Sequence, residues 1–306
     1  MRVAILDLGT NTFSLLIVDI QQNTYKEVHH AREVVKLGHE SESITNNIIS
    51  PEAFQRGVTA LCNLAAIIKK FEVDAVKALA TSAIREAENR QDFISEVRKQ
   101  AEINIEIISG AKEAELIYYG NRLAFTMTEE PYLIMDIGGG SNEFIIASNS
   151  TILWKQSFKL GVARLLSMFK PENPISEKTL QAVNNYLTAE LQPLLTELKK
   201  YNIHTLLGSS GAFESIVDMI GKEKTSDEKS GYHIDLEDYF MISKKTVHST
   251  SQQRELMPGL IPMRRDMIVL SYISINFILK NSSISKLGVS AYSLKEGAIS
   301  MFFKNH

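Results

Sequence analysis

Three consecutive glycines between two acidic residues form the stretch of this sequence that is best suited to chemistry. Asp136 precedes Gly138–Gly140, and Ser141 and Glu143 follow them. Glycines let the backbone turn tightly and bring its N–H groups close to an anion, while carboxylates on either side suit Mg²⁺ bridging to phosphate oxygens. The stretch therefore indicates a phosphate loop with a metal site. A β-hairpin with a glycine-rich turn is the competing interpretation, because glycine is the default turn residue.

The start of the chain has the same construction, which weakens the simple-turn interpretation. Asp7 follows an apolar run of strand type, and another such run begins at Phe13. The small polar turn between them consists of Gly9, Thr10, Asn11 and Thr12. Asp136 lies 129 residues after Asp7 (136 − 7), and Gly138 lies equally far after Gly9 (138 − 9). This repeat predicts two similar domains, each presenting a phosphate loop at a shared cleft.

An arginine follows the predicted strand at residues 75–80. Arg85 lies just beyond this strand and can reach into a cleft at the strand ends, where its guanidinium could hold a phosphate in bidentate fashion. The alternative is a surface ion pair with Glu86 or Glu88. Residue types alone leave both possibilities open.

An acidic residue lies near the start of a predicted helix at residues 111–124, after a predicted strand at 104–108. Glu113 falls in the first turn of this helix, where the helix dipole favours negative charge. A functional Glu113 would instead point into the cleft and take a proton from attacking water.

A third glycine-containing turn connects a short predicted strand at 204–207 to a helix beginning near Ala212. Its sequence is Gly208-Ser209-Ser210-Gly211. A strand, a glycine-serine turn and a helix N-terminus together can bind an anion. Taken alone the pattern is common, since turns between strands and helices often contain glycine.

Length and composition limit the class of protein. A chain of 306 residues is long enough for two domains, each with its own core. We expect boundaries of about 1–125 and 126–306, with a C-terminal helix at about 292–306 as a candidate to pack back onto the first domain. The net charge of −3 argues against a general nucleic-acid or membrane-surface binder. The single cysteine, Cys62, excludes an internal disulfide.

The sequence also bears on location and assembly. The first apolar run contains Asp7 and no cleavage pattern, so we expect no signal peptide, and no uncharged run reaches the length of a membrane span. We therefore expect a cytoplasmic protein without nucleic-acid or membrane partners. A homodimer is the default expectation for the oligomeric state.

Together, the motifs resemble the exopolyphosphatase / guanosine pentaphosphate phosphohydrolase (Ppx/GppA) phosphatase family. The matching segments, in the order of the family, are Asp7–Thr12, Ala80–Ala87, Ile107–Ala114, Asp136–Glu143, Leu160–Leu165 and Gly208–Gly211. The resemblance covers nearly the whole chain. It implies an α/β fold of two duplicated actin-like, ribonuclease-H-like domains with an interdomain cleft, the fold of acetate kinase, sugar kinases, Hsp70 and actin.

The resemblance also implies roles for individual residues. Glu113 would be the general base, with Arg85 assisting, and Mg²⁺ (or Mn²⁺) would be held by Asp136 and Glu143, with Asp7 as a further candidate ligand. The candidate phosphate-binding residues are Gly9, Thr10, Asn11, Thr12, Arg85, Gly138, Gly139, Gly140, Ser141, Gly208, Ser209 and Gly211. The implied activity is release of terminal phosphate from polyphosphate. The alternatives are hydrolysis of the 5′ γ-phosphate of pppGpp, a non-catalytic polyphosphate or alarmone sensor, and a kinase or ATPase of the same fold.

Three departures from the family pattern bear on the substrate. Glu115 stands where the family commonly has arginine, and Ser293-Leu294-Lys295-Glu296-Gly297 replaces the usual Gly-Leu-Arg-Glu-Gly. Lys295 supplies a compact ammonium charge where arginine would supply a planar guanidinium with several N–H donors. The longer members carry an additional C-terminal helical domain, and this chain is a short form without it. These departures predict a preference for short polyphosphates or distributive action on long ones.

Overall fold

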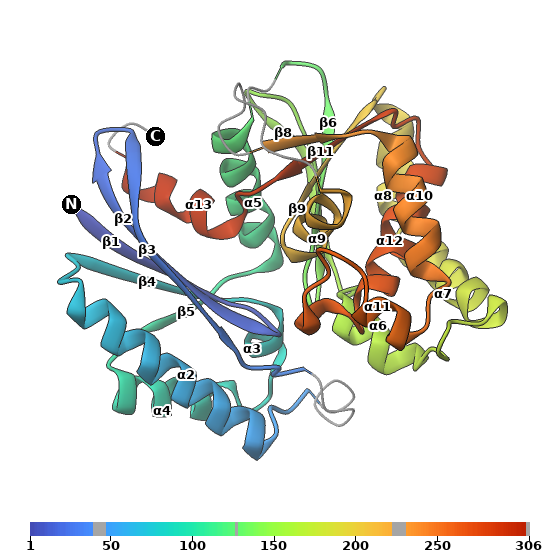
Figure 1. The fold of residues 1–306 in the computed structure, drawn as a ribbon. Helices are drawn as coiled ribbons and strands as arrows, with labels where there is room; N and C mark the ends of the chain where they lie inside the picture. The colour runs from blue at the N-terminus through green and yellow to red at the C-terminus, as the bar shows by residue number, and fades with distance from the viewer. Residues whose placement is uncertain (39–46, 126–127, 222–230, 304–306) are drawn as a thin grey trace. The chain divides into compact units, whose positions relative to one another are not determined.

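A computed structural model describes residues 1–38, 47–125, 128–221 and 231–303. It divides the chain into two compact units (Figure 1). Unit 1 comprises Met1–Gly120 and Leu294–His306, and unit 2 comprises Asn121–Ser293. Among the described helices, none combines the length and apolar character needed to cross a membrane.

Unit 1 is built on a five-stranded mixed sheet of order β3-β2-β1-β4-β5. Its strands are β1 (Arg2–Leu8), β2 (Thr12–Gln21), β3 (Thr24–Val34), β4 (Ala75–Ala80) and β5 (Ile105–Ile107). The first three form an antiparallel meander, whereas β4 runs parallel to β1 and β5. The helices are α2 (Pro51–Lys70), α3 (Ser82–Glu86), α4 (Arg90–Ala101), α5 (Gly110–Ala124, which continues past the unit boundary) and α13 (Leu294–Ile299).

Strand alternation decides which side chains of this sheet can do chemistry. Leu6 and Leu8 of β1 and Leu15 of β2 belong to the apolar core that α2 and α4 complete. Because successive side chains of a strand point to opposite faces, Asp7 and Ser14 lie on the other face, directly opposite each other. The same periodicity that builds the core therefore keeps the predicted metal ligand out of it.

The C-terminal segment returns to unit 1, where α13 contacts β1. The predicted helix at 292–306 is wrong in extent: α13 ends at Ile299, a 3₁₀ turn (η2) covers Ser300–Phe302, and residues 304–306 lie outside the described residues. The Ser290 hydroxyl accepts from the Tyr292 N–H (3.1 Å) and donates to the Tyr292 carbonyl (2.7 Å). This side-chain turn delays the helix, because serine competes with helical hydrogen bonding.

Unit 2 is built on a six-stranded mixed sheet of order β10-β11-β9-β6-β7-β8. Its strands are β6 (Tyr132–Ile137), β7 (Asn142–Ala147), β8 (Ile152–Phe158), β9 (Thr205–Ser209), β10 (Gly231–Ile234) and β11 (Lys286–Ser290). Its helical segments are α6 (Val162–Phe169), α7 (Glu177–Glu190), α8 (Gln192–Lys200), α9 (Gly211–Ile220), α10 (Leu236–Val247), α11 (Ser251–Glu255), η1 (Pro262–Arg264) and α12 (Ile268–Lys280).

The two units repeat one topology, as the offset of 129 residues predicts. In each, a meander of three antiparallel strands is followed by a strand that pairs in parallel with the first of them. The turns match as well, because the Gly9 N–H donates to the Thr12 carbonyl (3.1 Å) and the Gly138 N–H donates to the Ser141 carbonyl (3.0 Å). The expected duplicated α/β fold class is confirmed.

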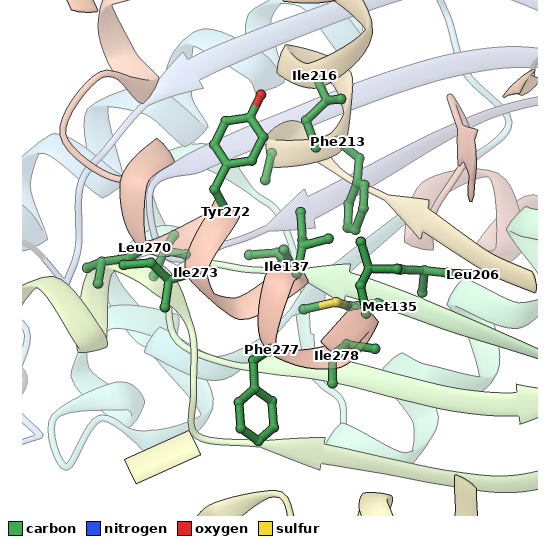
Figure 2. Packing of buried hydrophobic residues seen from close by; sticks show 14 of the residues in the cluster. Met135, Ile137, Leu206, Phe213, Ile216, Leu270, Tyr272, Ile273, Phe277 and Ile278 are labelled. Carbon is green, nitrogen blue, oxygen red and sulfur yellow. The ribbon is translucent and has the colours of Figure 1, made fainter. Parts of the chain in front are cut away.

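The core of unit 2 lies on one face of its sheet. Met135 and Ile137 of β6 pack against residues of α9 and α12 (Figure 2). The labelled members from the other elements are Leu206, Phe213, Ile216, Leu270, Tyr272, Ile273, Phe277 and Ile278. Asp136 lies between the two core residues of β6 in sequence, so its side chain belongs to the opposite face.

Gly297 in α13 provides a test of the packing within unit 1. A Cβ added there would lie 1.7 Å from the Leu116 carbonyl oxygen of α5, a backbone atom that cannot move aside easily. We expect Gly297→Ala to lower the free energy of unfolding by about 1–3 kcal/mol, measured by urea denaturation. Helix propensity alone would favour alanine. Stabilisation by Gly297→Ala would therefore contradict the close approach, and Met301→Ala, at an exposed position, should change little.

Candidate functional site

The first predicted phosphate turn is anchored through its backbone. Two consecutive N–H groups after β3, those of Val35 and Lys36, donate to the Asn11 carbonyl (2.9 and 3.0 Å). The Leu37 N–H donates to the Thr10 carbonyl (2.7 Å). These bonds hold the turn between β1 and β2 in one conformation, which is the preorganisation that an anion-binding turn requires.

Arg85 and Glu113, which the sequence places 28 residues apart, form an ion pair in unit 1. The Arg85 Nη1 lies 2.8 Å from the Glu113 Oε2 and also donates to the Ile108 carbonyl (3.1 Å). Because β4 and β5 are parallel neighbours, the helices that follow them, α3 and α5, begin at the same edge of the sheet. This edge brings the two side chains together.

The guanidinium of Arg85 has N–H groups that this ion pair does not use. Its side chain is 19% exposed, compared with 9% for Glu113. Both of its hydrogen bonds use Nη1, and in the part of the chain that the structure describes Nε and Nη2 have no acceptor. An arginine that served only to pair with a buried carboxylate would typically donate two parallel N–H bonds to its two oxygens. The geometry therefore suits an additional anion.

Two buried carboxylates lie directly opposite each other in unit 2. Asp136 on β6 and Glu143 on β7 are 6% and 1% exposed and are cross-strand partners. Directly opposed like charges are destabilising, and burial increases the cost because water no longer screens them. Hydroxyl donors hold both carboxylates: Ser209 donates to Asp136 (2.7 Å), and Ser157 donates to Glu143 (2.6 Å).

This donor set fits a hard divalent cation. Carboxylate oxygens are the ligands that Mg²⁺ prefers, and it usually takes one or two of them from protein together with water and substrate phosphates. No group of three or more acidic, histidine or cysteine residues with metal-binding geometry occurs among the described residues. Among those residues, the pair therefore fits an ion that keeps water ligands and can exchange them for phosphate oxygens better than a structural metal in a complete protein cage.

The glycine loop between these carboxylates has its carbonyls occupied and its N–H groups available. The Gly138 carbonyl accepts from the Val162 N–H (3.0 Å), and the Gly139 carbonyl accepts from the Ala163 N–H (2.9 Å) at the start of α6. Within the described ranges, the N–H groups of Gly139, Gly140 and Ser141 have no acceptor. Such consecutive donors form a concave anion site.

A further glycine makes the position of this loop possible. A Cβ on Gly161 would lie 2.3 Å from the carbonyl carbon and oxygen of Gly139, so only glycine fits there. This close approach explains why a glycine precedes α6. It lets the N–H groups at the start of α6 reach the carbonyls of the loop. Residue patterns alone assigned no role to Gly161.

The turn at residues 208–211 is strained and lies beside an arginine. Ser210 has φ 68° and ψ −177°, a backbone conformation that residues other than glycine rarely adopt. Its hydroxyl donates to the Ile137 carbonyl (2.8 Å). A Cβ on Gly211 would lie 2.7 Å from the Arg264 Nη2. In sequence, Arg264 is only half of a scattered basic pair, because nothing local indicates that it reaches the start of α9.

Arg264 is held in place by acidic and hydroxyl partners of α9. Its guanidinium pairs with Glu214 (2.6 Å) and donates to Ser215 (2.9 Å). Burial raises the pKa of the nearby Asp218 carboxyl above its ordinary value, and the charge of Arg264 opposes that shift. The structure thus places a cation beside the predicted glycine-serine turn.

The departures from the family pattern also have defined surroundings. Glu115 forms an ion pair with Lys112 (2.7 Å), three residues earlier on α5. The Ser293 hydroxyl donates to Asp136 (2.5 Å). The candidate residues divide between the two units. Unit 1 contains Asp7, the turn at 9–12, Arg85 and Glu113, and unit 2 contains Asp136, the loop at 138–141, Glu143, Gly208, Ser209 and Gly211.

Comparison with known proteins agrees with these motifs. Residues 16–306 match the family described as the Ppx/GppA phosphatase family. A crystal structure of an exopolyphosphatase from Cytophaga hutchinsonii is 35% identical, with a TM-score of 0.94 and 99% of both chains covered. Exopolyphosphatase 2 of Mycobacterium tuberculosis is 24% identical, and the match covers 97% of each protein.

A relative with a different named substrate matches at a similar level. The guanosine-5′-triphosphate,3′-diphosphate pyrophosphatase of Pseudoalteromonas translucida is 24% identical, and the match covers 97% of this chain but 58% of that protein. The fold of these proteins is the two-domain actin-like fold. On the family match and the structural likeness, this chain belongs to the Ppx/GppA phosphatase family.

Proposed function

We propose that this protein is a Mg²⁺-dependent phosphohydrolase that releases terminal phosphate from inorganic polyphosphate, with a preference for short chains. Members of its family are hydrolases of phosphoanhydride bonds. The observation that carries the proposal is the buried pair Asp136 and Glu143, which flanks a glycine loop with available N–H groups. Polyphosphate consists of phosphoanhydrides whose charge such a cation site and such donors would stabilise.

The proposed reaction is attack of water on the terminal phosphorus. Glu113 accepts a proton from this water as the new P–O bond forms, and the bridging P–O bond breaks. The products are phosphate and a chain that is one unit shorter. Arg85 would bind terminal phosphate oxygens through the donors that its ion pair does not use.

Asp136 and Glu143 would hold the cation, and Asp7, at the equivalent position of unit 1, is a further candidate ligand. When bound, Mg²⁺ (or Mn²⁺) neutralises charge on the phosphate oxygens as a Lewis acid. The N–H groups of the loop at 139–141 would donate to the same phosphates.

Hydrolysis of the 5′ γ-phosphate of pppGpp is the second candidate, because the reacting bond is of the same kind. The pyrophosphatase named for that substrate is the observation that favours it. A non-catalytic sensor would need no base, so the ion-paired Glu113 and Arg85 support hydrolysis over sensing. A kinase would require an adenosine site, for which the sequence contains no recognisable segment.

The preference for short chains rests on charge. A long polyanion needs an extended line of cations, and the chain has a net charge of −3 with no run of more than two basic residues. Glu115, where the family often has arginine, is occupied by its ion pair with Lys112. These features support distributive action.

The substrate prediction is tested by phosphate release with short polyphosphate, long polyphosphate, pppGpp and ATP assayed side by side. We expect the highest kcat/KM on short polyphosphate, and intermediate lengths on a gel during digestion of long chains. Full-length polymer and free phosphate with nothing between them would contradict distributive action. No release from any substrate, with retained binding, would favour a sensor.

Replacement of the proposed base gives the second prediction. Glu113→Gln should lower kcat by on the order of 10²–10⁴ while substrate binding is largely retained, because the amide cannot accept the proton. Single-turnover phosphate release and equilibrium polyphosphate binding measure the two effects separately. The control is Glu102→Gln, which changes an exposed carboxylate of unit 1 outside the proposed chemistry. Wild-type turnover in Glu113→Gln would remove this residue from the mechanism.

The proposed metal ligands give the third prediction. Asp136→Asn and Glu143→Gln should each raise the Mg²⁺ concentration for half-maximal activity, because a neutral oxygen replaces an anionic ligand. Mg²⁺ titration of initial rates at saturating substrate measures this shift. Full activity in excess chelator would refute a metal-dependent mechanism.

A further inference from the structure

Three serine hydroxyls surround the buried carboxylates of unit 2. Ser209 and Ser293 both donate to Oδ2 of Asp136, at 2.7 and 2.5 Å. Ser157 donates to Oε1 of Glu143 at 2.6 Å. All three distances lie in the short range that is typical of hydroxyl donors to carboxylate oxygens.

Two of the serines follow from the register of the sheet. Ser209 on β9 is the parallel partner of Asp136, and Ser157 on β8 is the antiparallel partner of Glu143. Asp136 and Glu143 are partners of each other. One row of side chains therefore crosses four adjacent strands, with a serine at each end and the two carboxylates in the middle.

Ser293 reaches Asp136 from outside the sheet. It follows β11, and the turn that Ser290 makes with Tyr292 directs the chain just before it. Ser293 stands where the family usually has glycine, which has no hydroxyl to donate. Ser157 lies outside the segments that carry the family resemblance, so neither residue is assigned by that resemblance.

We propose that Ser157 and Ser293 are positioning residues for the divalent-cation site, a proposal that rests on the proposed function. A hydroxyl donor fixes the orientation of a carboxylate without itself neutralising the negative charge that a cation would need. Hydrogen-bond donors behind ligating carboxylates tune metal affinity in this way, and their loss typically costs about 10–100-fold. Ser293 supplies Asp136 with a second such donor, beside Ser209.

A purely structural role is the competing explanation, because any buried carboxylate needs hydrogen bonds. The two explanations differ in what is measured. A structural role changes the stability of the apo protein, while cation affinity of the folded protein stays unchanged. A positioning role changes cation affinity, and a residue that retains the hydroxyl restores it.

The test is an electron paramagnetic resonance titration of Mn²⁺ with the full-length protein in the absence of polyphosphate. We expect Ser157→Ala and Ser293→Ala each to raise the Kd for Mn²⁺ by about tenfold. Ser293→Thr should stay near wild type because it keeps the hydroxyl. Ser274→Ala is the control away from the carboxylates, since Ser274 is a buried serine of unit 2 that donates to the Leu270 carbonyl of its own helix.

Activity provides a second, independent measurement. The Mg²⁺ concentration for half-maximal rate should rise in both alanine variants, while KM for polyphosphate at saturating Mg²⁺ stays unchanged. If an alanine variant fails to fold, Ser157→Cys and Ser293→Gly replace it, and the same loss of Mn²⁺ affinity is expected. Residue 293 lies directly before α13, outside any helix or strand, so the Ser293→Gly variant should fold.

The outcomes separate this proposal from the proposed function. Wild-type affinity for Mn²⁺ in folded serine variants, with weakened binding in Asp136→Asn, would overturn the positioning role and leave the metal assignment standing. Absence of Mn²⁺ binding by the wild-type protein, or unchanged binding in Asp136→Asn, would refute the metal assignment itself and this proposal with it.

Discussion

The constraint on which the rest of unit 2 depends is the burial of two negative charges directly opposite each other. Asp136 and Glu143 sit on adjacent strands of the sheet centre, where apolar pairs would be more stable. Such a pair persists only if its surroundings hold it, and hydroxyl donors from three segments contribute to this. A site that costs stability when empty is well suited to a ligand that carries positive charge.

The glycine loop and the carboxylate pair are parts of one local structure. The hairpin from β6 to β7 places Asp136 and Glu143 opposite each other and, at its end, exposes the N–H groups of residues 139–141. The start of α6 takes the carbonyls of the loop, and Gly161 permits the contact. One hairpin therefore carries carboxylates and available N–H groups together, the combination that the proposed binding of a metal ion and a phosphate would require.

Unit 1 uses the same hairpin with different residues. Asp7 is kept, but the position equivalent to Glu143 is Ser14, so this copy has one carboxylate where unit 2 has two. Its distinctive feature is instead the ion pair of Arg85 and Glu113, at the edge shared by two parallel strands. The duplicated units have thus diverged at the positions that bear charge while their strand order and register are retained.

Local patterns were sufficient to predict the hairpins and the duplication and to nominate most of the candidate residues. Asp136 and Glu143 are seven residues apart in a short hairpin, so alternation and turn length already imply that they share a face. Helix starts such as Ser50-Pro51 also depend on neighbours in sequence, and that hydroxyl accepts from the Ala53 N–H as expected. In such segments, residues close in sequence already restrict the backbone conformation to very few possibilities.

Tertiary structure alone decided the contacts between distant segments. Ser293 and Asp136 are 157 residues apart, and no local propensity predicts their hydrogen bond. The sequence left two possibilities for Arg85, an ion pair with surface acids or a position in a cleft. Because β4 and β5 are neighbours in the sheet, Glu113 is its partner. The C-terminal helix begins at Leu294, later than its pattern predicts, because a serine side chain competes for the backbone before it. The amino-acid sequence by itself determined the local turns and faces of this protein, whereas packing and strand order determined which side chains meet, because those depend on non-local register.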